Sequence, residues 1–404
     1  MSEEKLVPKL RFSGFTDEWN EVTLNDVATF SKGKGISKND ISNYGIECVR
    51  YGELYTKYNE MIYNIESKTD LDKNELKLSE KNDILIPCSG ETAIDLATAS
   101  CIQKDQVAIG GDITVIKTNQ YAPFITYYLN QKKTEIAKYA QGVSIVHLYP
   151  KDFKVMNIRI PSINEQKMII RLLEEITKKE QLLESKYQQY QEFKKYLMQQ
   201  IFTQKLRFVD FNNSSWKDYK FKDLGTVKSG VGFSNKYQGH LDLDYNFYKV
   251  SDMNLKGNEK VMTRSNNTID DNLLKDIGVK LIENPSIIFA KVGEAIFLNR
   301  KRIAKQPFLI DNNMMAFSPN ENVDLEFMYY LATSINFGKY AQTGALPSYN
   351  ASDIYSIKCK IPPIEEQKRI GKLLSLADNK IDFCSNQLNK TQEFKKGLLQ
   401  QMFV

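Results

Sequence analysis

The sequence contains few of the residues that form metal or redox sites. Only two of its 404 residues are histidine, and the two, His147 and His240, stand far apart in the sequence. The five cysteines are scattered, odd in number and never arranged as Cys-x-x-Cys: Cys48, Cys88, Cys101, Cys359 and Cys384. A zinc site or a disulfide framework is therefore not expected. We predict no metal ligands in this chain.

Nucleotide-binding and catalytic motifs are also missing. No Gly-Lys pair precedes Ser or Thr, so the sequence lacks the phosphate-binding loop of ATP-hydrolysing proteins. The stretch "SGVGFS" (229–234) contains Gly-x-Gly, but a turn at a strand end explains it better than a cofactor loop. "NPSI" (284–287) differs from the Asn-Pro-Pro-aromatic sequence of adenine methyltransferases. We predict no catalytic residue and no cofactor bound by this chain.

Long apolar runs are absent as well. No run approaches the roughly 18 residues that a membrane-spanning helix needs, and the start, "MSEEKLVPKLR", lacks the apolar region of a secretory signal. We expect a cytoplasmic protein without membrane contact. The net charge of +5 and the pI near 8.6 fit DNA binding only weakly, because many proteins with other partners share this balance.

What the chain does contain is an internal repeat. A shift of 201 residues superimposes "IPSINEQKMIIRLLEEI" (160–176) on "IPPIEEQKRIGKLLSLA" (361–377), and "QEFKKYLMQQIF" (191–202) on "QEFKKGLLQQMF" (392–403). "KLRF" likewise occurs at 9–12 and at 205–208, whereas residues 38–137 and 235–338 share only scattered patterns. The chain is thus two copies of one unit, each a variable globular region followed by a helical segment.

Each helical segment has the pattern of a coiled coil. Residues 162–202 contain no Pro or Gly, and Ser162 with Glu165 predicts a capping box at the start. Steps of three and four give one apolar seam per copy, which includes Ile169, Leu173, Ile176, Leu183 and Leu197 in the first and Ile370, Leu374, Ile381, Leu388 and Leu398 in the second. Gln166, Phe193, Gln367 and Phe394 recur in both copies, which suggests a shared surface for an identical partner. The alternative is two ordinary long helices packed on separate domains.

The variable regions are predicted to be mixed α+β. Apolar runs such as "DILIPC", "DITVIK" and "NMMAFSP" indicate strands, and residues 123–141 and 325–342 indicate one helix in each copy. "KLRF" at 205–208 is interpreted as the entry strand of the second copy. We therefore divide the chain into globular regions 1–158 and 205–359 and helical segments 159–204 and 360–404. The repeat also makes the chain cyclic in design, which predicts that its two ends lie near each other.

Three loop clusters in each copy combine Gly with cationic, hydroxyl or amide side chains. Such side chains bind phosphates and base edges, and Gly permits close approach of the backbone. The candidate DNA-binding residues are Lys32, Lys34, Ser37, Ser89, Thr92, Gln141, Ser144 and His147 in the first copy, and Lys228, Ser234, Asn235, Lys236, Lys291, Arg300, Lys301, Arg302, Gln342, Ser348 and Tyr349 in the second. Each loop alone is better explained as a solvated turn, but the recurrence strengthens the set.

The paired "IPSINEQK" and "IPPIEEQK" segments, their trailing helices and the "KGKGIS" opening resemble the specificity (S) subunit of type I DNA restriction-modification systems, the HsdS family. The resemblance covers essentially the whole chain. It implies two globular α+β target recognition domains, separated by two long helices that form an antiparallel coiled coil with pseudo-two-fold repeat. Each domain reads one half of a bipartite double-stranded DNA target, and the helices fix the spacer.

The resemblance also implies partners. Two methyltransferase subunits, which bring S-adenosylmethionine, dock on an S subunit, and two ATP-dependent translocase/nuclease (R) subunits complete the complex. S-adenosylmethionine, ATP and Mg are therefore expected on the partners. Divergence between the two variable regions predicts an asymmetric target. Two other readings stay open: a noncatalytic coiled-coil scaffold without a DNA role, and a self-contained nuclease or methylase, which the missing motifs disfavour.

Overall fold

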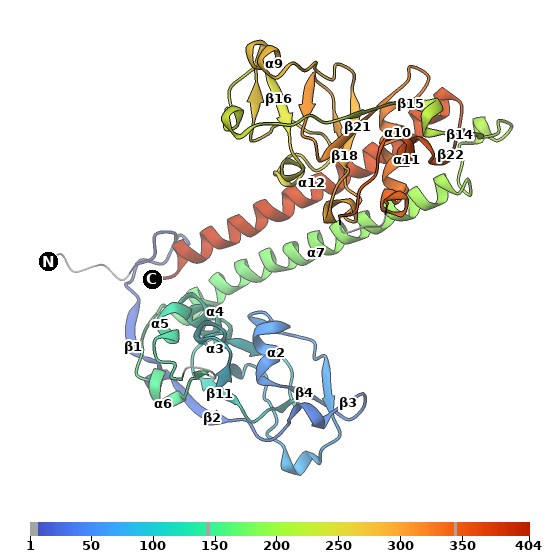
Figure 1. Ribbon diagram of the computed structural model, residues 1–404. Helices are drawn as coiled ribbons and strands as arrows, with labels where there is room; N and C mark the ends of the chain where they lie inside the picture. Colours follow the sequence, from blue (N-terminus) through green and yellow to red (C-terminus); the bar gives the residue numbers. More distant parts are fainter. Residues whose placement is uncertain (1–6, 143–145, 343–345) are drawn as a thin grey trace. The chain divides into compact units, whose positions relative to one another are not determined.

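The computed structural model describes residues 7–142, 146–342 and 346–404, which form two compact units (Figure 1). Unit 1 comprises Met1–Leu183 together with Gln387–Val404, and unit 2 comprises Glu184–Asn386. Two long helices, α7 (Ile163–Phe202) and α12 (Ile364–Met402), contribute one stretch to each unit.

Unit 1 is built on a five-stranded sheet in the order β2-β11-β7-β9-β5, with a four-stranded sheet β10-β4-β6-β3 and the pairs β1-β13 and β12-β8. The strands are β1 (Asn20–Thr23), β2 (Ala28–Lys32), β3 (Ile41–Ser42), β4 (Ile46–Val49), β5 (Met61–Ile62), β6 (Ser67–Thr69), β7 (Ile84–Pro87), β8 (Ser89–Gly90), β9 (Ser100–Ile102), β10 (Ala108–Ile109), β11 (Ile113–Thr118), β12 (Val146–His147) and β13 (Asn157–Ile160). The short helices are α1 (Leu24–Val27), α2 (Tyr51–Thr56), α3 (Ala93–Leu96), α4 (Ala122–Gln131), α5 (Lys133–Ala137) and α6 (Pro150–Phe153), with 3-10 turns η1 (Lys38–Asp40) and η2 (Lys73–Glu75).

Unit 2 repeats this plan with a four-stranded sheet β15-β21-β18-β19, a three-stranded sheet β17-β16-β20 and the pair β14-β22. Its strands are β14 (Lys217–Lys220), β15 (Gly225–Ser229), β16 (Tyr245–Tyr248), β17 (Thr268–Ile269), β18 (Ser286–Ala290), β19 (Lys301–Ala304), β20 (Phe308–Ile310), β21 (Met314–Pro319) and β22 (Lys358–Ile361). The helices are α8 (Phe221–Leu224), α9 (Asp271–Ile277), α10 (Leu325–Ser334) and α11 (Ala351–Tyr355), with η3 (Val209–Phe211), η4 (Asn235–Tyr237), η5 (Val250–Asn254), η6 (Glu294–Ile296) and η7 (Phe337–Tyr340). The predicted α+β class is confirmed.

The two long helices run antiparallel, as predicted. In unit 1, Lys395 Nζ of α12 lies 3.0 Å from Glu180 Oε2 of α7, and in unit 2, Lys194 of α7 forms an ion pair with Asp378 of α12. Residue numbers rise along one helix as they fall along the other. Glu180, Lys194 and Lys395 are polar positions within the apolar seams, and these three residues take part in two ion pairs between the helices.

At their ends the seams also join the cores of the globular regions. Ile169, Leu173 and Leu398 belong to the core of unit 1, which includes Trp19 and Phe124. The core of unit 2 contains Leu197, Ile370 and Leu374 with Trp216 and Phe327. Burial against a globular region, in addition to the partner helix, therefore stabilises each end of the pair.

The repeated "KLRF" segments anchor the two helices. Arg11 donates two hydrogen bonds of 2.8 Å to the Glu165 carboxylate, and Arg207 donates bonds of 3.1 and 2.7 Å to Glu366. Both glutamates are buried, and both belong to the duplicated I-P-x-I-x-E-Q-K motif. The motif thus recurs because each copy needs the same buried bidentate pair, which is stronger than an exposed one.

The capping box and the entry strand both need correction. The Glu165 amide donates to Ser162 Oγ at 3.4 Å as expected. The Glu165 carboxylate, however, accepts hydrogen bonds from Arg11 and not from the Ser162 backbone amide that a capping box requires. Residues 205–208 form no strand: Leu206 N donates to Gln200 O at 3.1 Å in a tight turn directly after α7. The backbone amides of Lys205 and Leu206, which a strand would pair with a neighbouring strand, donate here to the carbonyl of Gln200 in the last turn of α7.

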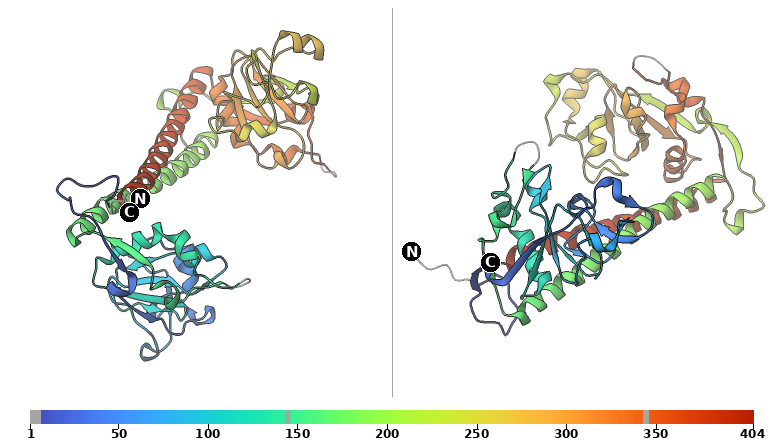
Figure 2. Two further views of the ribbon diagram at one scale, coloured as in Figure 1. Left: turned by 90° about the vertical axis from the view of Figure 1, so that its left-hand side faces the viewer. Right: turned by 90° about the horizontal axis from the view of Figure 1, so that it is seen from below.

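The same contact in unit 1 brings together residues from the two ends of the chain. Leu10 N donates to Gln401 O at 2.9 Å, and the segment before β1 lies beside the end of α12 (Figure 2). Phe403 stacks on Phe124 with ring centroids 5.3 Å apart and meets Trp19 edge-on. The predicted closeness of the two ends holds for the described residues.

The helices predicted over 123–141 and 325–342 are each interrupted. In the first, α4 ends at Gln131 and α5 begins at Lys133. In the second, α10 ends at Ser334, and Asn336 then accepts a hydrogen bond from Gly338 N to start η7. A short polar side chain that caps its own backbone competes with continued helix, which periodicity alone does not register.

Within the described part of the chain, no helix is both long and apolar enough to span a bilayer, and no group of three His, Cys, Asp or Glu residues could hold a metal ion. Cys48 and Cys101 are buried, and burial raises the pKa of their thiols to about 11 and about 12. These thiols pack as small apolar side chains.

Candidate nucleic-acid interface

The three loop clusters predicted in the first copy meet at one edge of the five-stranded sheet. Strand β2 ends where β11 begins, with Lys32 opposite Thr114, and β7 ends beside the same point, with Pro87 opposite Ile113. Strand β8 follows β7 directly and pairs with β12, which places His147 opposite Ser89. We call this end of the sheet, with the loops that follow β2, β7 and β8 and precede β12, the loop edge of unit 1.

Unit 2 has the same arrangement. Strand β15 ends with Ser229 opposite Met315 at the start of β21, and β18 ends with Ala290 opposite Met314. Lys291 N donates to Asn313 O, and Lys291 O accepts Tyr349 N, which brings the last loop to the same place. This is the loop edge of unit 2. In each sheet, strand pairing therefore joins residues that lie far apart in the sequence, such as Lys32 with Thr114 and Ser229 with Met315.

At the loop edge of unit 1 the cationic candidates are exposed. Lys32 and Lys34 both extend into solvent, and Lys32 Nζ lies 3.8 Å from Asp112 Oδ1 across the edge. Ser37 is exposed but accepts a hydrogen bond from Asn39 N, and Thr92 caps α3. These two hydroxyls order the loops that carry the neighbouring side chains.

The remaining candidates of unit 1 differ in exposure. Gln141 is exposed, and its backbone is held by a two-way hydrogen-bond pair with His147. The half-buried His147 ring stacks on Tyr149 at 5.9 Å. Ser89 is 8% exposed, so its side chain contributes little surface. Ser144 lies outside the described residues.

At the loop edge of unit 2 the exposed candidates form two groups. Strand β15 and the segment after it present Lys228, Ser234, Asn235 and Lys236, all of them exposed. The Lys236 ammonium lies 4.3 Å from the centre of the Tyr237 ring, and a hydrogen bond to the Tyr237 hydroxyl raises the pKa of Lys236. The other group contains exposed Arg300 and Gln342 and half-buried Lys291 and Ser348.

Three candidates of unit 2 prove to be structural in this fold. Lys301 is 2% exposed: its ammonium donates to Ile335 O at 2.9 Å and lies 4.0 Å from the centre of the Phe337 ring. Tyr349 is 4% exposed and donates its hydroxyl to Ala290 O. Arg302 is half-buried and donates to Met253 O at 3.2 Å. Strand β19 points alternate residues inward, so the run "NRKR" does not present every cation to solvent.

Sequence reasoning missed a matched pair of acids that hold the loop edges. Glu53 in α2 accepts from Arg50 N and from Ser67 Oγ, and it is 3% exposed. Asp252 in η5 is fully buried and accepts from Lys249 N and from Asn266. Each acid caps the element that follows a strand and ties a distant loop to it. The shared pattern of a cation followed three residues later by an acid was the available signal.

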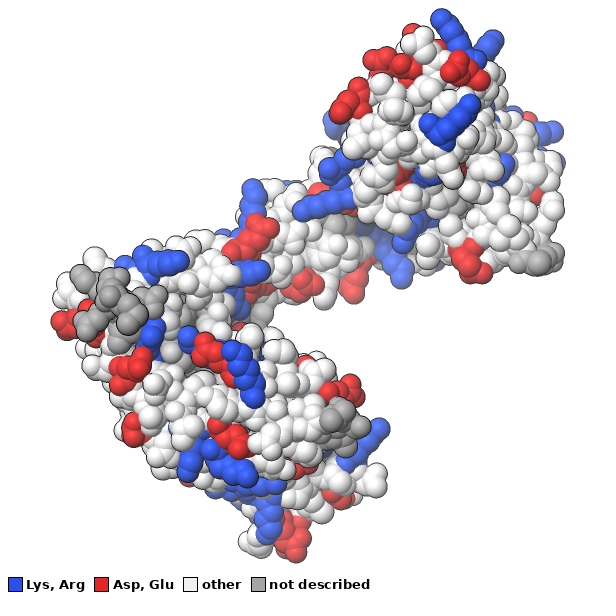
Figure 3. All heavy atoms as spheres, turned by 60° about the vertical axis from the view of Figure 1, so that its left-hand side comes forward, with Lys and Arg blue, Asp and Glu red and all other residues white. Residues whose placement is uncertain are grey.

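The charges do not gather into one basic patch on the surface that can be viewed. On the face shown in Figure 3, Lys and Arg side chains are interspersed with Asp and Glu and with uncharged surface. Lys32 facing Asp112 is one such mixed pair. At the loop edge of unit 1, Lys32 beside Asp112 places a donor next to an acceptor, the combination of groups that base-edge recognition uses.

Comparison with known families supports the repeat and its function. The family described as the type I restriction modification DNA specificity domain matches this chain twice, over residues 16–191 and 213–393. The chain belongs to that family. It is a DNA-binding specificity subunit of a type I restriction-modification system, with two repeated recognition domains.

Whole-length relatives carry the same description. The MjaVIII specificity subunit of Methanocaldococcus jannaschii is 21% identical over 95% of this chain and 91% of its own length. The EcoKI specificity subunit of Escherichia coli is 20% identical over 95% of this chain and 88% of its own. The crystal structure of an S subunit from M. genitalium has the same fold, with a TM-score of 0.65, 17% identity, and coverage of 98% and 99% of the two chains.

The helices of this specificity subunit carry two kinds of duplicated residue. Gln166 and Gln367 were predicted to face a partner, but both are buried: each accepts from the backbone at the start of a recognition-domain helix, at Tyr121 N and Asp324 N, and donates to a proline carbonyl. They therefore join helix to domain. Phe193 and Phe394, in contrast, are 53% and 57% exposed.

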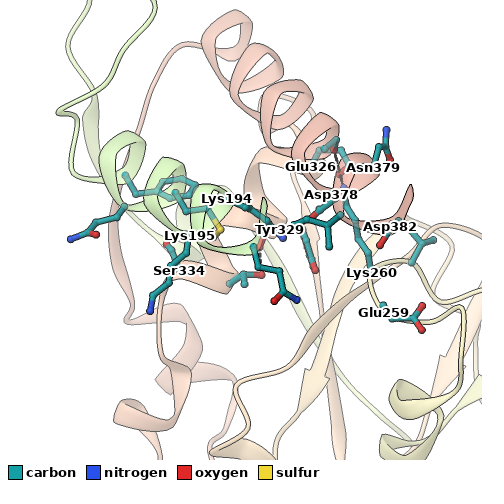
Figure 4. A pocket seen from close by; sticks show the side chains of 18 of the residues that line it. Lys194, Lys195, Glu259, Lys260, Glu326, Tyr329, Ser334, Asp378, Asn379 and Asp382 are labelled. Carbon is teal, nitrogen blue, oxygen red and sulfur yellow. Dashed lines mark hydrogen bonds and ion pairs between the residues drawn. The ribbon is translucent and has the colours of Figure 1, made fainter. Parts of the chain in front are cut away.

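A cavity of about 1390 Å³ lies between the helices and the recognition domain inside unit 2 (Figure 4). At its wall, the Lys260 ammonium lies 2.7 Å from Glu326 Oε2 and 3.5 Å from Asp378 Oδ2. Tyr330 donates its hydroxyl to Asp378, and Lys194 pairs with the same carboxylate. Burial, together with the Asp378 hydrogen bond, raises the pKa of Tyr330. This cluster links both long helices to the recognition domain.

Proposed function

We propose that this chain selects the DNA target of a type I restriction-modification complex by reading one half of an asymmetric bipartite sequence with each loop edge. The single observation that carries this proposal is the recurrence of the loop edge: the same strands bring three loops together in each unit, while the side chains on them differ. Duplicated readers are suited to the two half-sites of duplex DNA, and different side chains select different bases.

The helices in this proposal set the length of the nonspecific spacer and bind two methyltransferase subunits. The exposed, duplicated Phe193 and Phe394 support the second role, because each lies in the repeated sequence Gln-Glu-Phe-Lys-Lys and packing within the chain does not explain its retention. The methyltransferase subunits bring S-adenosylmethionine. Two ATP-dependent translocase/nuclease subunits complete the assembly, with Mg and ATP bound there.

The decisive experiment expresses the chain with its methyltransferase subunit and sequences the methylated sites of the host genome. A bipartite motif with two different halves is expected. Replacing residues 20–158 with the segment of another member should change one half and leave the other intact, because the second loop edge lies entirely in unit 2. A change in both halves, or the absence of a motif, contradicts the proposal.

The alternative is a scaffold without a DNA role, and the dependence of DNA affinity on salt concentration distinguishes the two functions. DNA readers that contact phosphates lose affinity steeply as salt is added, by about 10³-fold or more between 50 and 200 mM when six or more phosphates are contacted. We expect such a slope for the complex with the methyltransferase. A flat response, or no binding at any salt concentration, favours the scaffold.

A further inference from the structure

Unit 2 has a mainly apolar cavity at its loop edge. A cavity of about 370 Å³ is lined by Met253, Ala290 and Phe297, among others. Leu298, next to Phe297, lines the cavity too, and the side chains of Phe297 and Leu298 are 54% and 58% exposed. A single exposed apolar side chain is ordinary, but two adjacent ones at the rim of a cavity form a surface suited to an apolar group.

The position of this cavity connects it with the candidate DNA-binding loops. Ala290 is the last residue of β18, and Phe289 pairs with Lys301, the first residue of β19. Arg300, immediately before β19, lies on the cavity wall. The cavity therefore opens at the sheet end where Lys291 and the loops after β15 and β18 meet.

The polar groups around the cavity match a nucleic acid. Arg300 is exposed, and its guanidinium is oriented by a hydrogen bond to Asn254 Oδ1. Glu294 also lines the cavity and is exposed, so one strong acceptor stands beside one strong donor. Arginine binds phosphate and guanine, and a carboxylate accepts from the amino group of cytosine. An apolar segment of a protein would leave both charges unused.

The repeat supplies an independent observation. "GE" occurs at 90–91, shortly before α3, and at 293–294, where Glu294 begins η6. The third residue after each glutamate is Ile94 in unit 1 and Phe297 in unit 2. Ile94 is 48% exposed. An exposed apolar side chain thus follows the Gly-Glu pair at the same sequence spacing in both units, although Ile94 lies within α3 and Phe297 directly after η6.

We propose that Phe297 contacts the C5-methyl group of a thymine in the half-site read by unit 2, and that Ile94 does the same in the half-site read by unit 1. In the major groove the thymine methyl is the apolar group that distinguishes this base, and apolar side chains recognise it. This inference rests on the proposed function and names the chemistry that each loop edge recognises. It requires that each half-site contains at least one A·T pair.

The test removes only that methyl group. After methylation sequencing has given the target, each thymine of the duplex is replaced in turn by uracil, and binding to the purified complex with methyltransferase is measured. One uracil in the unit 2 half-site should weaken binding about fourfold, the effect of one buried methyl group. The Phe297→Ala complex should bind the thymine and uracil duplexes equally, whereas Phe297→Leu should still discriminate.

Ile94→Ala is the matched control. It should lose discrimination in the unit 1 half-site and keep it in the other. Uracil duplexes that bind as well as thymine duplexes, discrimination that survives Phe297→Ala, or a half-site without an A·T pair would each overturn the inference while leaving the bipartite reading intact. Loss of methyltransferase assembly in Phe297→Ala would show that a protein occupies the cavity. Absence of any bipartite target would overturn both proposals.

Discussion

The two units share their anchors but differ in the contacts between recognition domain and helices. In unit 1, Tyr63 donates to Glu174 of α7 at 3.1 Å, and Thr177 lies beside the buried Tyr127. A shift of 201 residues places Ser375 and Asp378 at the positions of Glu174 and Thr177. The acid has thus moved by one turn of the helix.

The recognition domains also differ in charge where they contact these helix positions. Glu60 precedes β5 in unit 1, and Lys260 occupies the corresponding place before Val261 in unit 2, where it pairs with Asp378. The charge on the domain side is therefore opposite in the two units. The comparison teaches that the buried Arg–Glu anchors define a common frame, whereas the surrounding ion pairs suit each domain to its own helices.

Removal of an anchor should have the largest effect. Arg207→Ala leaves the Glu366 carboxylate, which is 0% exposed, without its cation. Loss of one partner of a buried pair costs about 3–5 kcal/mol in the free energy of unfolding. Because the chain has one tryptophan in each core, a Trp19→Phe background reports unit 2 through the fluorescence of Trp216 during urea denaturation.

The matched substitution in unit 1 sharpens this comparison. Arg207 Nη1 also donates to Ser214 O at 2.6 Å, whereas Arg11 Nη1 has no hydrogen-bond partner among the described residues. Arg11→Ala should therefore cost about 1 kcal/mol less than Arg207→Ala, the value of one such bond. Equal costs, or a negligible cost in either unit, would contradict the common frame.

A pH titration should distinguish the units next. The link from strand to helix in unit 1 is neutral: Asn130 bonds both backbone groups of Ala99, at 3.1 and 2.8 Å. In unit 2 the corresponding link is made by Lys301, whose ammonium donates to Ile335 O. Burial lowers the pKa of this ammonium to about 7. The unfolded chain keeps its proton from pH 7 to 9 while the folded one has released it, so stability rises with pH in this range.

We expect unit 2 to gain about 2 kcal/mol relative to a Lys301→Met variant between pH 7 and 9. The variant removes the ionisable group and keeps most of the side-chain volume. Urea denaturation of both proteins at pH 7, 8 and 9, followed through Trp216, measures the difference. A constant difference between the two proteins over this range would show that Lys301 keeps its charge in the fold.

The Lys260 cluster should contribute less, because its members are partly exposed. Lys260→Ala leaves Glu326 and Asp378 without the shared cation, and we expect a loss of about 1 kcal/mol in unit 2 that shrinks in 1 M salt. Lys305→Ala is the control: the Lys305 side chain is 53% exposed, and its ammonium lies 3.7 Å from Glu326. It should change stability by less than about 0.5 kcal/mol. An equal effect of both variants would mean that the cluster does not fix the domain.

A circular permutant should have the smallest effect. Opening the chain near Thr203 and joining the native ends replaces the local contact of Leu206 with Gln200 by a cut, and converts the contact of Leu10 with Gln401 into a local one. Because the two contacts are equivalent, the permutant should specify the same methylation motif. Methylation sequencing measures this outcome, and failure to assemble would contradict the cyclic reading.

Part of the fold was predictable from periodicity and repetition. The first long helix was predicted over 162–202, a stretch without Pro or Gly, and α7 spans Ile163–Phe202, because Pro161 precedes it and the apolar steps continue past the polar positions Glu180 and Lys194. Strands such as β7 and β11 were predictable as short apolar runs. The break of α10 before Asn336 was not, since a capping side chain acts against the local apolar pattern.

The candidate site was predictable as a set of loops but not residue by residue. Recurrence of Gly-rich segments found the strand ends that the sheets bring together. The exposure of Phe297 and the burial of Lys301 were missed, because both depend on neighbours far along the chain, such as Ile335 and the Phe337 ring above the Lys301 ammonium. The cationic run "NRKR" (299–302) is typical of exposed surface, but the alternation of side chains along β19 turns Lys301 inward.

The sequence alone determined that this protein is one unit used twice, each copy with a long helix that carries an apolar seam, because repetition and helical periodicity act over short, regular spacings. The buried Arg–Glu anchors join residues 154 and 159 positions apart, so the sequence pattern did not show them. Only the tertiary structure decided which loop side chains reach solvent and which acid faces which base at the junction of domain and helices. Those outcomes depend on strand pairing between segments about 100 residues apart, where burial and desolvation determine whether a charged side chain binds a partner or supports the fold.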